Sequence, residues 1–312
     1  MNPWLLLFGG LGVLTLGARG LISGGGSLAL RFGITPLVIG LTVMAYGTSA
    51  PELVVSAEAA LRDRGGIALG NVIGSNVCNV ALILGFCALL RPLTAHRKIV
   101  SRETPILIGV SVLAMLLLLD RHLGRIDGIV MLMLLAVYSW YIIRAARRDA
   151  TTEPSDSPPR RYSLGLSLLF TLGGLALLIV GAEGFVDGAV TLARSWGWSE
   201  LLIGLTVIAV GTSMPEFALS TVATLRHESD VALGNVVGSC LFNLLGILGV
   251  VGVIHPTAVP ELNPLDLVVM VATTLALLPL LWGDRRITRW EGGVLLVCYA
   301  VYTWWMFQRG GA

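Results

Sequence analysis

Two glutamates, Glu52 and Glu216, stand inside strongly apolar stretches, and each directly follows a proline, in "AYGTSAPELVV" and "AVGTSMPEFAL". Proline has no amide hydrogen, and its ring pushes against the carbonyl group four residues earlier. Both stretches are therefore predicted to be interrupted helices, with freed carbonyls around residues 45–47 and 209–211. In an apolar environment such carbonyls need a polar partner. A cation is the expected partner, because a carbonyl oxygen is the negative end of a dipole.

Further oxygen-bearing side chains recur at helical spacing around both glutamates. Thr48 and Glu52 are four residues apart and share a helical face, with Ser49 beside them. Oxygen is the ligand type that hard cations such as Ca2+ and Na+ prefer, whereas zinc or copper favours His and Cys. The four histidines fall at predicted loop ends, and the four cysteines lack metal-ligand spacing. The candidate side chains beside the glutamates are Thr48, Ser49, Ser75 and Asn79, and then Thr212, Ser213, Ser239 and Asn243.

The elements that must position these residues are membrane helices. The chain is 55% hydrophobic and 13% charged, whereas a soluble domain carries about 25% charged residues. A spanning helix needs roughly 20 apolar residues. Ten such windows are predicted, at 3–29, 34–60, 66–90, 104–119, 126–146, 163–193, 198–224, 230–255, 264–282 and 290–308.

The charged residues predict the orientation of these helices. In a ten-helix topology, 15 of the 21 Lys and Arg residues lie on one side, and the positive-inside rule puts that side in the cytoplasm. We expect an integral protein of a prokaryotic plasma (inner) membrane, surrounded by the lipid bilayer, with both termini outside. The net charge of +2 is a topology signal and does not indicate a nucleic-acid partner.

The chain contains an internal repeat. Residues 40–79 and 204–243 share 22 identities in 40 positions at a constant offset of 164, without a gap. The matches concentrate on Gly, Thr, Ser, Pro, Glu and Asn, which lipid contact does not demand. The predicted units are a five-helix repeat at 1–146, a polar cytoplasmic linker at 147–162 and a second five-helix repeat at 163–312. Because five is odd, tandem units enter the membrane from opposite sides. The predicted fold is an all-α membrane protein of ten transmembrane helices, built as two inverted five-helix repeats with helices two and seven broken.

The two carboxylates require compensation. An ionised carboxylate at the centre of a bilayer costs from about 2.5 to more than 10 kcal/mol, and no basic residue is near either glutamate in sequence. One Ca2+ would balance both charges, two or more Na+ could fill partial sites, and protons could replace either ion. An empty site would leave two like charges facing each other, which disfavours transit without an ion. Competition for one pair of acids is a physical basis for exchange.

The repeated motifs carry a family resemblance. "GTSAPE" with "GNVIGSNVCN", and "GTSMPE" with "GNVVGSCLFN", resemble the two alpha-repeats of the Ca2+/cation antiporter superfamily, of the sodium/calcium exchanger type. The resemblance covers essentially the whole chain. It implies Na+-driven Ca2+ antiport by alternating access, with helices one and six sliding past a core of the other eight. No cofactor is implied beyond the transported ions, and the oligomeric state stays open.

The resemblance also implies roles for individual residues. Glu52 and Glu216 would bind Ca2+ together with the main chain or hydroxyls of Thr48 and Thr212. Asn243 stands where some relatives carry an aspartate, which argues against a K+-dependent exchanger. Asn79 and Asn243 would complete the central site, and Na+ would be bound by Ser49, Ser213, Ser75, Ser239 and the carbonyls of Ala45 and Ala209.

Three other functions fit the sequence less well than Na+/Ca2+ antiport. Proton-coupled exchange of Ca2+ or another divalent cation on the same scaffold is the alternative, although that branch generally lacks the "GTSxPE" proline. A passive cation channel also accommodates polar breaks at mid-membrane, but two mirrored halves supply two gates around one site. An enzyme is not expected, because the sequence contains no nucleophile–base pair, HExxH motif or phosphate-binding loop.

Overall fold

The computed structural model describes residues 2–149, 162–197, 209–260 and 262–310, and these ranges are helical apart from loops and four two-residue strands. The first half contains α1 (Pro3–Phe32), α2 (Pro36–Ile39), η1 (Gly40–Met44), α3 (Ala45–Thr48), α4 (Ala50–Leu61), α5 (Gly65–Val77), η2 (Cys78–Ile83), α6 (Leu84–Leu90), β1 (Leu93–Thr94), η3 (Ile99–Glu103), α7 (Thr104–Leu117), β2 (His122–Leu123) and α8 (Arg125–Asp149). The second half contains α9 (Leu164–Ser195), α11 (Ala209–Thr212), α12 (Met214–Leu225), α13 (Ser229–Phe242), η5 (Asn243–Ile247), α14 (Leu248–Ile254), β3 (Thr257–Ala258), α15 (Pro264–Leu281), β4 (Arg286–Ile287) and α16 (Arg289–Gly310). The segments labelled η are π-helices.

Each predicted window is helical over most of its described residues, although some boundaries were wrong. The fourth helix begins at Ile99 rather than residue 104, as the π-helix η3. The charged Arg102 and Glu103 led to the shorter prediction, but Glu103 is buried and accepts a hydrogen bond from the Tyr138 hydroxyl at 2.9 Å. The fifth helix continues to Asp149, into the predicted linker. Residues 150–161 of that linker and 198–208 of the seventh window lie outside the described residues.

Among the described residues, seven helices are long and apolar enough to cross a membrane. The count rises to eight if the bent pair formed by 37–48 and α4 is one span. The helix α16 is present but is not one of the seven. Large apolar side chains such as Leu169 and Val180 on α9 are exposed, as lipid-facing residues would be. The chain is therefore an all-helical protein with the architecture of an integral membrane protein.

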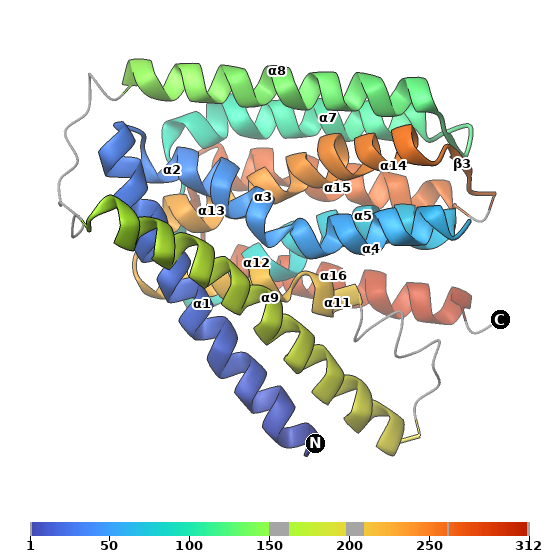
Figure 1. Ribbon diagram of the computed structural model, residues 1–312. Helices are drawn as coiled ribbons and strands as arrows, with labels where there is room; N and C mark the ends of the chain where they lie inside the picture. The colour runs from blue at the N-terminus through green and yellow to red at the C-terminus, as the bar shows by residue number, and fades with distance from the viewer. Residues whose placement is uncertain (1, 150–161, 198–208, 261, 311–312) are drawn as a thin grey trace.

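Two helical segments form the centre of the molecule. They are the continuous runs α5–η2–α6 and α13–η5–α14, in which 78% of the most apolar window is buried. In the five other candidate spans that share is only 22–33%. Figure 1 shows α7 and α8 stacked on one side of this centre. The central runs carry the "GNVIGS" and "GNVVGS" motifs, so the polar residues of these motifs are held in the best-packed part of the protein.

The helices α1 and α9 pack against each other and extend together away from the other helices (Figure 1). Glycine allows their backbones to touch. A Cβ atom added to Gly17 would lie 2.8 Å from the carbonyl oxygen of Gly174, and one added to Gly174 would lie 2.4 Å from the amide nitrogen of Leu21. Such distances exclude any side chain at these positions. The glycine faces of these two helices thus face each other.

Two short ladders join the halves of the chain. In one, β1 pairs antiparallel with β4, so that Leu93 lies opposite Ile287. In the other, β2 pairs antiparallel with β3, so that Leu123 lies opposite Thr257. Thr257 follows Leu93 by 164 positions, and Ile287 follows Leu123 by the same number. The two ladders are therefore copies of one another under the offset found in the sequence.

Candidate cation site

One residue separates consecutive helices two positions before the proline of each "PE" pair, at Ser49 and Ser213. Ser49 separates α3 from α4 with φ −84° and ψ 7°, and Ser213 separates α11 from α12 with φ −86° and ψ 8°. The axis of the first pair bends by 43°. The prolines lie in the first turns of α4 and α12, where a missing amide hydrogen is tolerated. Each glutamate is thereby placed in the first turn of a new helix.

The structure brings Glu52 and Glu216 into one hydrogen-bonded cluster that crosses between the halves. Both are fully buried, with 0% of their surface exposed. The Ser49 hydroxyl donates to Glu216 Oε1 at 2.6 Å, and the Ser213 hydroxyl donates to Glu52 Oε1 at 3.2 Å. Each serine therefore donates a hydrogen bond to the carboxylate of the opposite half. Ser239 donates to Glu216 Oε1 at 3.3 Å, which brings a third helix into the cluster.

Among the described residues, one oxygen of each carboxylate has no hydrogen-bond partner. Glu52 Oε2 and Glu216 Oε2 are both buried and unpartnered. Within the described residues, no Lys, Arg or His forms an ion pair with either glutamate. A buried charge without a partner is costly. The arrangement is suited to a positively charged ligand that supplies the missing partner.

Asn79 and Asn243 are placed by π-helices. Asn79 lies in η2, and Asn243 is the first residue of η5. Both side chains are fully buried, and in the part of the chain that the structure describes neither their oxygen nor their nitrogen atoms have a hydrogen-bond partner. Insertions of π-helix inside α-helices are frequent at functional sites. Ser75, from the same helical run as Asn79, accepts a hydrogen bond from Ser213 at 3.4 Å and so belongs to the cluster.

The predicted main-chain ligands have a different environment from the one expected. The Ala45 carbonyl was expected to be freed by the break, but it still accepts the helical hydrogen bond from the Ser49 amide at 3.0 Å. It also accepts from the Ser239 hydroxyl at 3.4 Å. The reason is that the proline lies six residues later, so its missing amide hydrogen affects the Gly47 carbonyl instead. Ala209 begins α11, and its side chain lies outside the described residues.

Sequence reasoning overlooked two asparagines, Asn71 and Asn235. The Thr48 hydroxyl donates to Asn235 Oδ1 at 3.3 Å, and the Thr212 hydroxyl donates to Asn71 Oδ1 at 3.4 Å. Both contacts cross between the halves. A signal was available, because Asn71 precedes Ser75 by four residues and so lies on the same helical face.

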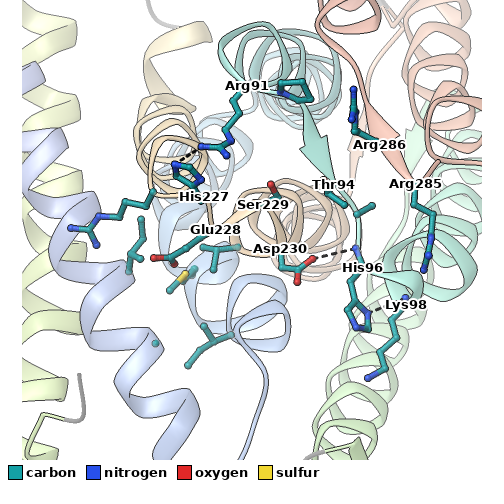
Figure 2. Close-up of a pocket in the computed structure, with 18 of the residues that line it drawn as sticks. Arg91, Thr94, His96, Lys98, His227, Glu228, Ser229, Asp230, Arg285 and Arg286 are labelled. Atoms are coloured by element: carbon teal, nitrogen blue, oxygen red, sulfur yellow. Dashed lines mark hydrogen bonds between the residues drawn. The ribbon is translucent and has the colours of Figure 1, made fainter. Parts of the chain in front are cut away.

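A cavity of about 1430 Å³ lies among the basic loops (Figure 2). Its lining also includes Ile39 and Met44, and Met44 directly precedes Ala45. Burial raises the pKa of Glu228, which lines the cavity, against the opposing effect of Arg226. The cavity is thus bordered by loops of the predicted cytoplasmic face and by the helical segment before Ser49. Its charged lining residues are Arg91, Arg97, Lys98, Arg226, Arg285 and Arg286, together with the acids Glu228, Asp230 and Asp284.

Comparison with known proteins identifies the family. The sequence pattern of the family described as "Sodium/calcium exchanger protein" matches this chain twice, at residues 2–144 and 166–308. The chain belongs to the sodium/calcium exchanger family. The two matched ranges begin and end 164 positions apart, the offset of the repeat. The exchanger is therefore a membrane transport protein of the Ca2+/cation antiporter superfamily.

Individual relatives resemble this exchanger over nearly its whole length. It is 41% identical to CaxA of Alkalimonas amylolytica, with 96% of this chain and 97% of the relative covered. It is 38% identical to the inner membrane protein YrbG of Escherichia coli, with 89% and 88% covered. The solved structure of the sodium-calcium exchanger NCX_Mj superimposes with a TM-score of 0.83 at 31% identity, covering 96% of this chain and 97% of that one.

Proposed function

We propose that this exchanger carries Ca2+ across the membrane in one direction and Na+ in the other, at one midplane site formed by Glu52 and Glu216. The observation that carries the proposal is the pair of buried carboxylates from the two halves, each with one unpartnered oxygen. A single Ca2+ would neutralise both charges. The Ser49 and Ser213 contacts leave those unpartnered oxygens available as ligands.

The surrounding oxygens extend the proposed site. Ca2+ takes six to eight oxygen ligands at roughly 2.3–2.6 Å in a flexible geometry, which two carboxylates alone cannot supply. The buried amides of Asn79 and Asn243 are available for this purpose, because their oxygens have no hydrogen-bond partner among the described residues. The hydroxyls or main chain of Thr48 and Thr212 would add to the Ca2+ site. Na+ would be bound by Ser49, Ser213, Ser75, Ser239 and the carbonyls of Ala45 and Ala209.

The proposed architecture is the ten-helix inverted repeat, with units at 1–146 and 163–312, a cytoplasmic linker between them, and broken helices two and seven. The equivalent breaks at Ser49 and Ser213 and the two equivalent strand ladders support it. Alternating access would move the α1–α9 pair against the remaining helices. The basic loops would face the cytoplasm of a prokaryotic cell, with the plasma (inner) membrane as the location and both termini outside.

The test is uptake of labelled Ca2+ into vesicles that contain the purified protein. Vesicles loaded with Na+ and diluted into Na+-free buffer are expected to accumulate Ca2+. Vesicles loaded with K+ at the same pH are the control, and acid-loaded vesicles test proton coupling. Uptake driven by the proton gradient alone would replace the Na+ assignment with H+/Ca2+ exchange. Uptake that persists without any gradient of Na+ or H+ would refute antiport.

The proposed site has its own test in the same vesicles. Glu52→Gln and Glu216→Gln each remove one of the two charges that a single Ca2+ would balance, and both variants are expected to abolish Na+-driven uptake. The matched control is Glu58→Gln, which changes an exposed carboxyl on α4 that pairs with Arg62. Full uptake in both site variants would exclude Glu52 and Glu216 as the ion ligands.

A further inference from the structure

We propose that Asn71 and Asn235 are positioning residues that set the direction of the hydroxyl hydrogens of Thr212 and Thr48. Each asparagine acts on the threonine of the opposite half, so the pair links the two halves of the ion site. The inference rests on the proposed function, because the direction of these hydrogens matters only if the hydroxyl or carbonyl oxygens around them bind an ion.

The orientation of the Asn71 amide follows from its contacts. Its Nδ2 donates to the main-chain carbonyl of Glu52 at 3.3 Å and to the Ser56 hydroxyl at 2.9 Å. A carbonyl oxygen only accepts hydrogen bonds, so the end of the amide that meets Glu52 must be the nitrogen. The oxygen Oδ1 then faces Thr212, which donates to it at 3.4 Å. The amide is thus held between the helix of one glutamate and the break before the other.

Asn235 repeats this arrangement in the other half. It is fully buried, its Nδ2 donates to the Ser220 hydroxyl at 3.1 Å, and its Oδ1 accepts from Thr48 at 3.3 Å. Asn235, Ser220 and Thr212 follow Asn71, Ser56 and Thr48 by 164 positions each. The same hydrogen bond thus occurs twice, each time between the two halves, and such a repetition is not expected of an accidental contact.

The chemical consequence is clearest at Thr48. Its hydroxyl has one hydrogen and two acceptors at 3.3 Å, the Ala45 carbonyl and Asn235 Oδ1. The Ala45 carbonyl already accepts from the Ser49 amide. The Ser239 hydroxyl also lies 3.4 Å from this carbonyl, but its one hydrogen has Glu216 Oε1 at 3.3 Å as another acceptor. With the Thr48 hydrogen directed to Asn235 and the Ser239 hydrogen directed to Glu216, the second lone pair of the Ala45 carbonyl is open to a cation. The direction of the Thr48 hydrogen also points the positive end of the Thr48 hydroxyl dipole toward Asn235 and away from the proposed ion, so that the hydroxyl oxygen can act as a ligand.

A double-mutant cycle separates this role from simple packing. The variants are Asn235→Ala, Thr48→Val and their combination, and the readout is the Ca2+ dissociation constant of the purified full-length protein measured by calorimetry. Asn235→Ala alone is expected to weaken Ca2+ binding about two- to tenfold, the range for one lost hydrogen bond. In the Thr48→Val background it is expected to change binding little, because the hydroxyl it orients is gone.

A second cycle and a matched control complete the experiment. Asn71→Ala with Thr212→Val tests the other copy, and it decides the question if Asn235→Ala does not fold. The control is Asn76→Ala, which truncates a fully buried asparagine on α5 whose Nδ2 bonds within its own helix to the Val72 carbonyl. Effects that add in both cycles, or an equal loss of binding in Asn76→Ala, would overturn the inference.

The outcomes also distinguish this inference from the proposed function. Vesicle assays of the same variants should show a raised KM for Ca2+ with the maximal rate largely retained. If the wild type exchanges Ca2+ for protons instead of Na+, the coupling assignment fails while the cycles still decide on the asparagines. Additive cycles in a protein that exchanges Na+ for Ca2+ would overturn the asparagine role alone. A wild type that does not bind Ca2+ would overturn both.

Discussion

The substitution Glu216→Gln tests the charge argument at the site most directly. Glutamine keeps nearly the same shape and can still accept hydrogen bonds from Ser49 and Ser239 through its amide oxygen. Those contacts are at 2.6 and 3.3 Å on Oε1 in the wild type. The unpartnered Oε2 is replaced by an amide nitrogen whose hydrogens would point toward the ion. The change therefore removes one charge and one ligand while leaving the serine contacts available.

The expected loss is large because the site is fully buried. Removing one partner of a buried charge pair typically costs about 3–5 kcal/mol. At about 1.4 kcal/mol per factor of ten, the Ca2+ dissociation constant should rise roughly a hundredfold to several thousandfold. At a Ca2+ concentration of about 100 times the wild-type dissociation constant, bound Ca2+ would stabilise the wild type by about 2.7 kcal/mol and a hundredfold weaker variant by only about 0.4 kcal/mol.

The assay is thermal unfolding of the purified protein with and without Ca2+, supported by calorimetric titration. The Ca2+-induced rise in Tm should be clear in the wild type and nearly absent in Glu216→Gln. In ion-free buffer the variant should be at least as stable as the wild type, because one of two facing negative charges has been removed. Glu58→Gln should behave as the wild type. A Glu216→Gln variant whose Ca2+ affinity falls by less than about fivefold would refute the charge argument.

Three further predictions concern the helix contact at Gly17, the site residue Asn243 and the loop residue Glu228. Gly17→Leu should lower Tm, because its Cβ would lie 2.8 Å from the Gly174 carbonyl oxygen, and overpacking of this kind costs about 1–3 kcal/mol. The control is Gly12→Leu, since a Cβ atom added at Gly12 would have no neighbouring atom within 4 Å. Asn243→Asp should make Ca2+ uptake depend on an added monovalent cation, because the site would then hold three carboxylates and one Ca2+ balances only two of them. Uptake that is insensitive to added K+ or Na+ would contradict this prediction. Burial raises the pKa of Glu228, so the folded state holds the proton of this carboxyl more tightly than the unfolded state does. The contribution of Glu228 to stability therefore falls as the pH rises from its ordinary pKa of about 4.3 through its raised pKa in the folded state. Unfolding curves of Glu228→Gln at pH values across that range should accordingly lose part of the wild-type pH dependence.

Much of the site follows from local chemistry and was predictable. Proline next to glutamate in an apolar run demands both a helix break and charge compensation, and both demands can be read from neighbouring residues. The repeat at an offset of 164 is equally visible in the sequence. These features predicted helix breaks at Pro51 and Pro215 and the oxygen character of the site, whereas consecutive helices in the structure are separated two residues earlier, at Ser49 and Ser213. The extent of the fourth helix was mispredicted, because local charge at Glu103 outweighed a tertiary contact with Tyr138 that compensates it.

The pairing across the halves was decided only by tertiary structure. Helical spacing places Thr48 and Glu52 on one face, yet Ser49 donates to Glu216 in the other half, and Thr48 donates to Asn235. Spacing along one helix carries no information about which distant helix packs against it, and the π-helical residues at Asn79 change the facing of the side chains that follow. The sequence alone therefore determined which oxygens the protein offers around the two glutamates. The packing of the two halves decided which oxygen meets which, because hydrogen-bond geometry is set by contacts between residues far apart in the chain.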